Sequence, residues 1–409
     1  MKKLVILGAG CAGTMVANKL RQKLRKEEWQ ITLIDKDNNH VYQPGLLFLP
    51  FEIYQPEEIV RPRSKYVSKG IDFVVDEITK VDAKEQVVET ASGRFPYDKI
   101  IVSTGIDIMP DEIDGMMDAW YKSAFDFYTL QGAINLTEAM KNFREGRMVL
   151  NIAEMPIKCP VAPLEFIFLA DWFFHEKGVR DKVEIILVTP LSGAFTKPKA
   201  SEYFSTLAES KGIQIVPDFD ILEVDAEKKQ IHSGQKTTVD YDLLVSIPPQ
   251  GGARYLVDSK VAMDDTGYIQ TDKHTMKATK HENMWVLGDV TNIPTSKAGS
   301  VAHFSGDVLV ENFISEINGE PLTASFDGHS SCFIETGFGK GALIDFNYDF
   351  EPLPGKFPLP GVGPFTLLGE SKANHWGKVL FKWVYWNKLI TGDDMPLASS
   401  MSLAGKDSD

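Results

Sequence analysis

The first 35 residues contain the pattern that most constrains the fold. An apolar run at residues 3–7 leads into the glycine turn of residues 8–13, and apolar residues at helical spacing follow through Leu24. A second apolar run at residues 31–34 ends on Asp35, 22 residues after Gly13. Strand, glycine turn, helix, strand and terminal acid together are the fingerprint of a dinucleotide-binding βαβ unit. The sequence therefore predicts an α/β fold built on a parallel sheet.

Each residue type in this fingerprint has a physical role. Gly8 permits a tight turn, Gly10 lets the backbone approach a pyrophosphate, and Gly13 lets the helix pack closely on the strand. The helix N-terminus supplies N–H donors and positive potential for phosphates, and Asp35 can accept from a ribose hydroxyl. We expect the cofactor to contact Gly8, Ala9, Gly10, Cys11, Ala12, Gly13, Asp35 and Lys36, with Cys11 in a structural role.

Length and composition exclude several classes of protein. A chain of 409 residues exceeds the roughly 250–300 residues that one hydrophobic core supports, so at least two domains are expected. A net charge of −14 argues against nucleic acid as a partner. We expect neither a transmembrane helix nor a signal peptide, because every apolar run is too short. Three cysteines without Cys-x-x-Cys spacing favour neither a disulfide scaffold nor a metal site.

Two later strands share one pattern. Residues 97–105 begin with Tyr-Asp, continue as an apolar strand and end in Thr104-Gly105, and residues 241–248 repeat the Tyr-Asp start and the apolar run. This echo predicts a duplicated architecture. Residues 73–75 and 87–90 are interpreted as strands of an antiparallel excursion, and residues 283–289 as a strand ending in Gly288-Asp289.

The glycine turn, Thr104-Gly105 and Gly288-Asp289, in this order, resemble the flavoprotein disulfide reductase superfamily, whose members contain two Rossmann-like dinucleotide-binding domains. The resemblance covers about residues 1–310 and implies FAD, with Asp289 on its ribityl chain. The FAD is expected to be noncovalent, because residues 39–45 offer no cysteine. Further residues expected to contact FAD are Gln43, Pro44, Ile78, Thr104, Gly105, Gly288 and Lys297.

The second nucleotide site is degenerate. Members of this superfamily carry a second glycine fingerprint for NAD(P)H, expected here after the apolar run at residues 148–152. Residues 153–165 instead read Ala-Glu-Met-Pro-Ile-Lys-Cys-Pro-Val-Ala-Pro-Leu-Glu. The glycines are absent, and three prolines remove N–H donors that a phosphate needs. Glu154 would also repel a pyrophosphate, so nicotinamide binding is disfavoured.

Cys159 takes the place of the lost phosphate loop, before a helix predicted over residues 163–174. The helix N-terminus and Lys158 are expected to lower the pKa of its thiol. Cys332 lies on a predicted strand at residues 330–337. This placement of two cysteines resembles sulfide:quinone oxidoreductases and implies a redox pair on one face of the flavin, sulfide as substrate and quinone as acceptor. Ser123 stands where many bacterial members carry a further cysteine, which implies a two-cysteine subtype.

Other candidate residues follow from the same resemblance. Lys297 is expected at the flavin edge, where a cation would stabilise reduced flavin or polarise a quinone oxygen. Glu165 is a candidate proton acceptor, with His175 and His303 as alternatives. The expected walls of a quinone pocket are Phe338, Gly339, Phe346 and Tyr348.

The tail contains a predicted helix at residues 372–390 with four lysines and no acid. Aromatic residues mixed with lysine suit a membrane headgroup region, and the segment is too polar to span a bilayer. Lys378, Lys382 and Lys388 are expected to flank an apolar face formed by Val379, Phe381, Trp383 and Trp386. The alternative is a helix packed on the core. If the tail is an anchor, removal of residues 372–409 would leave sulfide-dependent flavin reduction intact.

The predicted organisation is a first part of an FAD domain (1–110), a second Rossmann-like domain with the degenerate site (111–275), the second FAD part (276–355) and a membrane-associating region (356–409). We expect a peripheral, monotopic protein, with the cytoplasmic side favoured and homo-oligomerisation left open. The expected activity is oxidation of sulfide to sulfane sulfur or polysulfide, with two electrons passed to quinone. Two alternatives remain: a type II NADH:quinone dehydrogenase, which needs an intact second fingerprint, and a non-catalytic flavoprotein that binds a partner.

Overall fold

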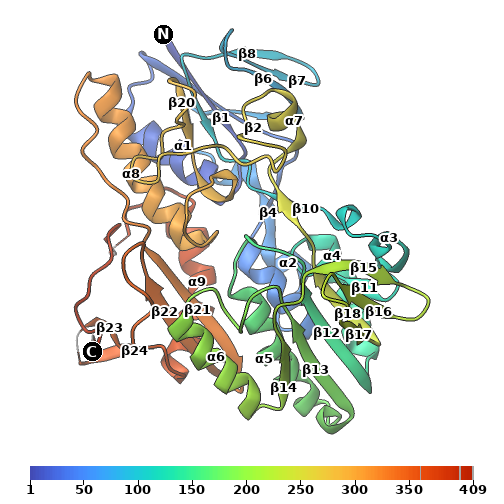
Figure 1. Cartoon of the computed structure of the whole chain (residues 1–409). Coiled ribbons are helices and arrows are strands. Elements are labelled where there is room, and N and C mark those ends of the chain that lie inside the picture. The colour runs from blue at the N-terminus through green and yellow to red at the C-terminus, as the bar shows by residue number, and fades with distance from the viewer. Residues whose placement is uncertain (360, 396–397, 408–409) are drawn as a thin grey trace.

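The computed structural model describes residues 1–359, 361–395 and 398–407, and this part of the chain contains two five-stranded parallel sheets in two lobes (Figure 1). The first sheet has the strand order β20-β9-β1-β2-β5. Helices α1 (Cys11–Lys23) and α8 (Gly299–Ile317) pack against each other in this lobe. The strands are β1 (Lys2–Leu7), β2 (Trp29–Asp35), β5 (Asp72–Val75), β9 (Lys99–Val102) and β20 (Met284–Val286).

The second sheet has the order β11-β18-β12-β13-β14, again with parallel neighbours. Its strands are β11 (Ala124–Phe125), β12 (Gly146–Ile152), β13 (Val183–Val188), β14 (Ile213–Val216) and β18 (Leu243–Ile247). The long helices of this part of the chain are α4 (Leu130–Asn142), α5 (Ala162–Glu176) and α6 (Pro198–Ser210).

The two lobes repeat one plan, and the repeated Tyr-Asp pair has the same role in each. Asp98 Oδ2 accepts a hydrogen bond from the Lys3 N–H at 2.6 Å, and Asp242 Oδ2 accepts one from the Arg147 N–H at 2.8 Å. Each carboxylate therefore holds the start of the central strand of its sheet, β1 or β12. The predicted duplicated architecture is confirmed.

Each lobe also carries an antiparallel three-stranded ladder. The ladders are β6 (Ile78–Asp82), β7 (Val87–Thr90) and β8 (Arg94–Pro96), and β15 (Ile221–Asp225), β16 (Gln230–Ser233) and β17 (Thr238–Asp240). One expectation was wrong: Phe73–Val75 belongs to β5, which pairs in parallel with β2 and not with the ladder. A run of three apolar residues specifies a strand without specifying its partner.

The C-terminal sheet has the order β21-β22-β24-β23 and lies below the first lobe, beside the second (Figure 1). Its strands are β21 (Ser330–Gly337), β22 (Lys340–Phe346), β23 (Gly355–Leu359) and β24 (Gly363–Leu367). Helix α9 (Lys372–Val384) packs on β21, β22 and β24, and a π-helical turn, η6 (Tyr385–Leu389), continues it. The chain then returns to the first lobe, where Asn18 Nδ2 donates to the Ile390 carbonyl at 2.7 Å.

Short elements connect these layers. They are β3 (Asn39–Val41), η1 (Gln43–Phe51), α2 (Pro56–Ile59), β4 (Val60–Pro62), η2 (Arg63–Lys65), β10 (Asp107–Ile108), η3 (Pro110–Glu112), α3 (Met116–Ala119), η4 (Arg180–Lys182), β19 (Gln250–Gly251), α7 (Arg254–Asp258) and η5 (Gly288–Val290). Strands β10 and β19 pair where the chain passes between the lobes.

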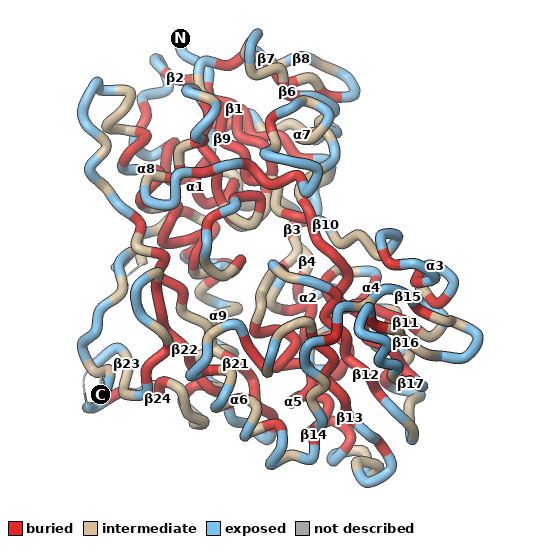
Figure 2. The backbone as a smooth tube through the Cα atoms, viewed as in Figure 1, coloured by how far each residue is buried: buried red, intermediate tan, exposed pale blue. Residues whose placement is uncertain are grey.

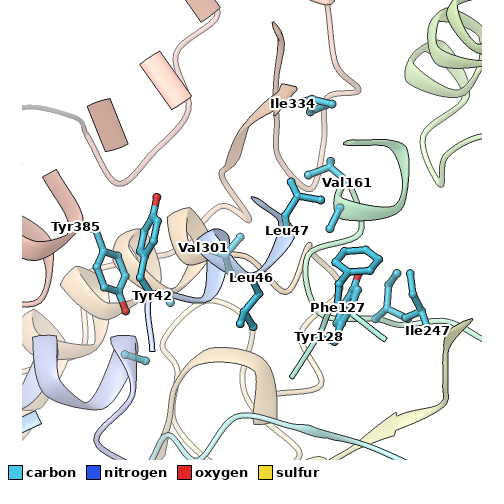
Figure 3. Packing of buried hydrophobic residues seen from close by; sticks show 14 of the residues in the cluster. Tyr42, Leu46, Leu47, Phe127, Tyr128, Val161, Ile247, Val301, Ile334 and Tyr385 are labelled. Carbon is cyan, nitrogen blue, oxygen red and sulfur yellow. The ribbon is translucent and has the colours of Figure 1, made fainter. Parts of the chain in front are cut away.

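Buried residues run through both lobes and into the C-terminal sheet (Figure 2). One apolar cluster includes residues of α1, η1, α5, β21 and η6, so it joins the first lobe, the second lobe and the tail. Figure 3 shows part of it: a row of side chains from Tyr385 and Tyr42 through Leu46 and Leu47 to Phe127 and Tyr128. The domain limits predicted from the sequence stay a prediction.

Candidate active site

The glycine turn before α1 has the shape that a pyrophosphate requires. A Cβ atom on Gly8 would lie 2.6 Å from the Ser103 carbonyl oxygen, and one on Gly13 would overlap the Gly8 carbonyl, so neither position accepts a side chain. A Cβ on Gly10 would have no atom within 4 Å. Helix α1 begins here without a side-chain cap and without an acid in its first turn. Free N–H donors and open space therefore meet at this turn.

Asp35 holds the turn from the next strand. Its Oδ2 accepts a hydrogen bond from the Ala9 N–H at 2.6 Å, and its Oδ1 forms an ion pair with Arg63. Lys36 is exposed. Arg63 was missed by the sequence analysis, because it lies in η2 and outside any contiguous motif. It places a cation beside the expected ribose position.

The end of β9 offers unused polar groups. The Thr104 hydroxyl and the nearby Tyr255 hydroxyl are buried without a hydrogen-bond partner, and a Cβ on Gly105 would have no atom within 4 Å. Burial raises the pKa of Asp289, while Lys297 and Lys158 counteract the shift. Unpaired hydroxyls and open space at the predicted positions fit an FAD. Residues 43 and 44 begin η1 and residue 78 begins β6; contact of these residues with FAD stays a prediction.

Cys159 is attached to the first lobe through its backbone. Its N–H donates to the Lys297 carbonyl at 2.7 Å, and its carbonyl accepts from the Ala162 N–H at 2.9 Å and from the Tyr128 hydroxyl at 3.2 Å. Cys159 adopts a left-handed conformation with φ of 51°. The loop that replaces the second phosphate loop therefore lies directly against the segment that follows Gly288-Asp289.

Lys297 is buried, and its ammonium group donates hydrogen bonds to two backbone carbonyls. Its Nζ donates to the carbonyls of Asp289 at 2.7 Å and Thr291 at 2.8 Å, and it lies 4.3 Å from the centre of the Tyr268 ring. Burial lowers the pKa of Lys297 to about 8. The lysine thus stabilises the turn that contains Gly288 and Asp289. Its contact with a flavin stays a prediction.

Helix α5 and strand β21 bring the second cysteine to the same region. Glu165 Oε1, on α5, accepts a hydrogen bond from the Glu335 N–H at 2.9 Å, on β21. Cys159 precedes α5 and Cys332 lies on β21, and a negative charge on Cys332 raises the pKa of Cys159. All three cysteines are free thiols in this structure.

The thiol pKa values differ in direction from the sequence-based expectation. Burial raises the pKa of Cys159 to about 12 and that of Cys332 to about 11. Helix α5 begins three residues after Cys159, and Lys158 Nζ donates to the Tyr128 carbonyl at 3.3 Å. The N–H of Ala162, the first residue of α5, lowers the pKa of Cys159, but burial outweighs this effect and the thiolate stays disfavoured.

The cation that does face both cysteines is Lys378, which the sequence analysis assigned to a membrane surface. Its Nζ lies 2.8 Å from Glu165 Oε1 and donates to the Phe333 carbonyl at 3.1 Å. It lowers the pKa of both Cys159 and Cys332. A signal was present in the sequence: Lys378 lies on the helix face opposite Trp376 and Leu380, and a lysine on an inner face needs a buried acid.

A hydrogen-bonded histidine–carboxylate pair lies beside this ion pair. His375 Nδ1 is 3.0 Å from Glu335 Oε2, and burial raises the pKa of Glu335. Of the alternative proton acceptors, His175 hydrogen-bonds the Asp171 carbonyl at 2.8 Å, whereas both ring nitrogens of His303 are buried without a partner. Glu165 is the candidate that the structure brings next to the cysteine pair.

The four expected quinone residues do not surround one pocket. Phe338 and Gly339 form the turn between β21 and β22, and Phe338 is 46% exposed. Phe346 is buried at the far end of β22, and Tyr348 donates from its hydroxyl to the Lys273 carbonyl at 3.0 Å. At about 3.3 Å per residue, Gly339 and Phe346 are roughly 20 Å apart. Quinone contact by any one of them stays a prediction.

The outward face of α9 is apolar and not lysine-rich. Trp376, Leu380 and Trp383 are 65%, 58% and 56% exposed, at the spacing of one helix face. Lys382 is 3.1 Å from Glu58, and Lys388 is 3.0 Å from Asp393. The prediction of which residues form the exposed face was therefore partly wrong, since Phe381 is half-buried and Trp386 is buried in the core. Among the described residues, no helix has both the length and the apolar character to cross a bilayer.

Comparisons with known proteins agree with this architecture. The mitochondrial sulfide:quinone oxidoreductase of Dictyostelium discoideum is 28% identical over 95% of this chain and 86% of that protein. A type II NADH:quinone oxidoreductase of Staphylococcus aureus is 33% identical over 87% of this chain and 92% of that protein. The X-ray structure of the sulfide:quinone oxidoreductase from Aquifex aeolicus superimposes with a TM-score of 0.81 at 18% identity, covering 96% of this chain and 92% of that one.

The family model for pyridine nucleotide-disulphide oxidoreductases matches residues 2–142 and 169–306. The unmatched stretch between these segments, residues 143–168, carries the degenerate loop and Cys159. The matched segments contain the glycine turn and the strands of both parallel sheets except β12. The chain therefore belongs to the pyridine nucleotide-disulphide oxidoreductase family.

Proposed function

We propose that this chain is a sulfide:quinone oxidoreductase with noncovalently bound FAD. It oxidises hydrosulfide to sulfane sulfur or polysulfide through Cys159 and Cys332, and it passes two electrons to a membrane quinone. The observation that carries the proposal is the position of Cys159, which replaces the second phosphate loop and is hydrogen-bonded to the Lys297 carbonyl in the flavin lobe. The names of the Dictyostelium and Aquifex relatives support the same activity.

The second lobe argues against NADH as the electron donor, although the Staphylococcus relative bears that name. A dinucleotide would need N–H donors after β12, and the loop there contains Pro156, Pro160 and Pro163. The first turn of α5 carries a buried acid, Glu165, which is paired with Lys378. A carboxylate in the first helical turn occupies the electrostatic position that a pyrophosphate would take.

The cysteine pair performs the sulfur chemistry. Hydrosulfide attacks one sulfur of a Cys159–Cys332 disulfide, the S–S bond breaks, and the products are a persulfide on one cysteine and a thiolate on the other. No net electrons leave the protein in this step. FAD, when bound, supplies the two-electron carrier between this site and quinone.

Lys378 lowers the free-energy cost of forming the leaving thiolate in a buried site. An isolated buried thiolate is costly, as the raised pKa values of Cys159 and Cys332 indicate. The ammonium group of Lys378 lowers that cost without cancelling it, and Glu165 holds the ammonium group with both carboxylate oxygens, at 2.8 and 3.1 Å. Glu165 is also our candidate acceptor for the proton of the incoming hydrosulfide.

The outer face of α9 is the proposed membrane-docking surface. Trp376, Leu380 and Trp383 are its exposed apolar side chains. Such a surface suits the interfacial region of a bilayer, where aromatic and aliphatic side chains partition. Peripheral docking would bring the enzyme to a quinone dissolved in the bilayer. The side of the membrane stays a prediction.

One experiment separates the three candidate functions. The flavin absorbance of the purified protein is followed anaerobically during additions of sulfide, with NADH in a parallel cuvette. Bleaching by sulfide alone supports the proposal, and bleaching by NADH alone would establish a type II NADH:quinone dehydrogenase. A flavin that neither donor reduces would favour the non-catalytic, partner-binding alternative.

A further inference from the structure

The C-terminal turn η6 reaches back to the glycine turn of the first lobe. The Tyr385 hydroxyl lies 2.7 Å from His40 Nε2, and both residues are buried. The same hydroxyl lies close enough to the thiol of Cys11, the first residue of α1, for each group to shift the pKa of the other. Residues far apart in the sequence therefore meet directly behind the loop that is expected to hold the pyrophosphate.

Aromatic packing fixes this contact from several sides. The Tyr385 and Tyr42 rings lie edge to face with centroids 4.9 Å apart, and Figure 3 shows the two rings next to each other. The Trp386 ring lies 5.4 Å from His40, and the Arg61 guanidinium lies 4.5 Å from the Trp386 ring. The turn has no freedom to move away from β3 and η1 without breaking this packing.

The next residues of the tail bind α1 itself. Asn18 Nδ2 donates to the Ile390 carbonyl at 2.7 Å, and Lys19 Nζ lies 3.6 Å from Asp394. Ile390 and Asp394 are thus attached to α1, the helix whose N-terminus faces the expected cofactor site, and Tyr385 is attached to His40 of β3. Movement of the segment from Tyr385 to Asp394 would move or loosen the glycine turn.

On its other side, the same helical segment carries the apolar docking face. Tyr385 follows the exposed Trp383 by only two residues, so about 3 Å of helix axis separates them. A continuous helix is stiff over this length. Restraint of α9 at a bilayer surface would therefore extend to Tyr385 and to the residues packed around it.

Resting on the membrane docking in the proposed function, we propose that His40 and Tyr385 couple docking of α9 on a lipid bilayer to retention of FAD. Both act as positioning residues through the glycine turn. Because coupling between two binding events is reciprocal, a bilayer slows FAD release and bound FAD strengthens membrane binding. The pair would thus favour a loaded cofactor at the membrane where quinone is found.

The test measures FAD release from the purified holoprotein by the rise in flavin fluorescence, with and without vesicles of phosphatidylcholine and phosphatidylglycerol. Vesicles should slow release from the wild type by about three- to tenfold. Tyr385→Phe keeps the ring and loses the hydroxyl. In this variant the ratio of the FAD release rate without vesicles to the rate with vesicles should fall below two. His40→Gln should have the same effect, and it is the second variant should Tyr385→Phe fail to fold.

A matched control is Tyr241→Phe, which removes a buried hydroxyl in the second lobe that lies 3.4 Å from Ser123 Oγ. It should keep the full effect of vesicles. Co-sedimentation with the same vesicles is measured separately. A wild type that does not sediment would overturn the proposed membrane docking. A wild type that sediments but releases FAD at an unchanged rate would overturn the coupling, as would a Tyr385→Phe variant with the wild-type ratio.

Discussion

Lys378 Nζ lies 2.8 Å from Glu165 Oε1, and this buried ion pair joins the C-terminal helix α9 to helix α5, which follows Cys159. The contact places a positive charge from the last fifth of the chain beside two cysteines, and this charge lowers the pKa of both thiols, although burial keeps both values far above neutral pH. The tail is consequently part of the site as well as the proposed contact with the bilayer.

Replacement of Lys378 by methionine should slow sulfide-dependent flavin reduction by about 10- to 100-fold, because the thiolate formed by hydrosulfide attack loses its cation. The same change leaves Glu165 buried and unpaired, with a stability cost of roughly 3–5 kcal/mol. Stopped-flow reduction and urea denaturation measure the two effects.

The double variant Lys378→Met with Glu165→Gln should recover stability but not rate, which separates charge stabilisation from folding. Lys382→Met is the matched control, since Lys382 pairs with Glu58 at the surface. A Lys378→Met protein with a wild-type reduction rate would contradict the role given to this lysine.

Stability of the reduced protein should depend on pH through the two thiols. Folding raises the pKa of Cys159 from 9.0 to about 12 and that of Cys332 from 9.0 to about 11. The native state therefore binds these protons more tightly than the unfolded state, and this stabilisation is full below pH 9 and is lost as pH rises toward 11–12.

Urea denaturation between pH 8 and 11 provides the measurement. The wild type should lose more stability over this interval than the double variant Cys159→Ser with Cys332→Ser, in which neither thiol titrates. Equal slopes for the two proteins would contradict the burial of the thiols.

Cys159→Ser and Cys332→Ser should each abolish sulfide-dependent quinone reduction while the protein keeps its FAD, because a single cysteine cannot form the disulfide that hydrosulfide attacks. Quinone assays and the flavin content of the purified variants are the measurements. Cys11→Ala should retain most of the activity, since Cys11 faces Tyr385 and not the cysteine pair. Normal turnover in either serine variant would refute the assignment.

The exposed face of α9 should bind bilayers mainly through apolar burial. Leu380→Ser combined with Trp383→Ser should lower vesicle partitioning by at least 100-fold, at roughly 2 kcal/mol for each buried side chain. Binding of the wild type should persist in 1 M salt, because three of the four lysines of the tail helix, Lys378, Lys382 and Lys388, are paired with acids. Co-sedimentation across a salt series is the measurement, and release by salt alone would favour headgroup attraction.

Deletion of residues 372–409 should abolish FAD retention and flavin reduction by sulfide. The sequence-based expectation was the opposite; this prediction rests on the buried positions of Tyr385 and Trp386 and on the Lys378–Glu165 pair. Flavin content and the melting temperature of the truncated protein provide the test. If the truncated protein retains FAD and its flavin is still reduced by sulfide, the tail is only a membrane anchor and this prediction is contradicted.

Local patterns in the sequence determined the parts of the protein whose physics is local. Three features could be identified from the sequence: the glycine turn at residues 8–13, the acid at Asp35 and the Tyr-Asp starts of two strands. They could be identified because turn geometry, helix termini and strand burial depend on neighbouring residues. The loss of the second phosphate loop was equally readable, since prolines cannot donate. The family and the parallel-sheet architecture followed from these features.

Only the tertiary structure decided which distant side chains meet. The partner of β5, the pairing of Lys378 with Glu165 and the contact of Tyr385 with His40 each join segments separated by tens to hundreds of residues. The same lysine-rich helix is compatible with a headgroup surface or a buried ion pair, because periodicity assigns residues to a face but not the neighbour of that face. Burial against a particular acid, and the desolvation that makes this pair necessary, arises only when the chain has folded.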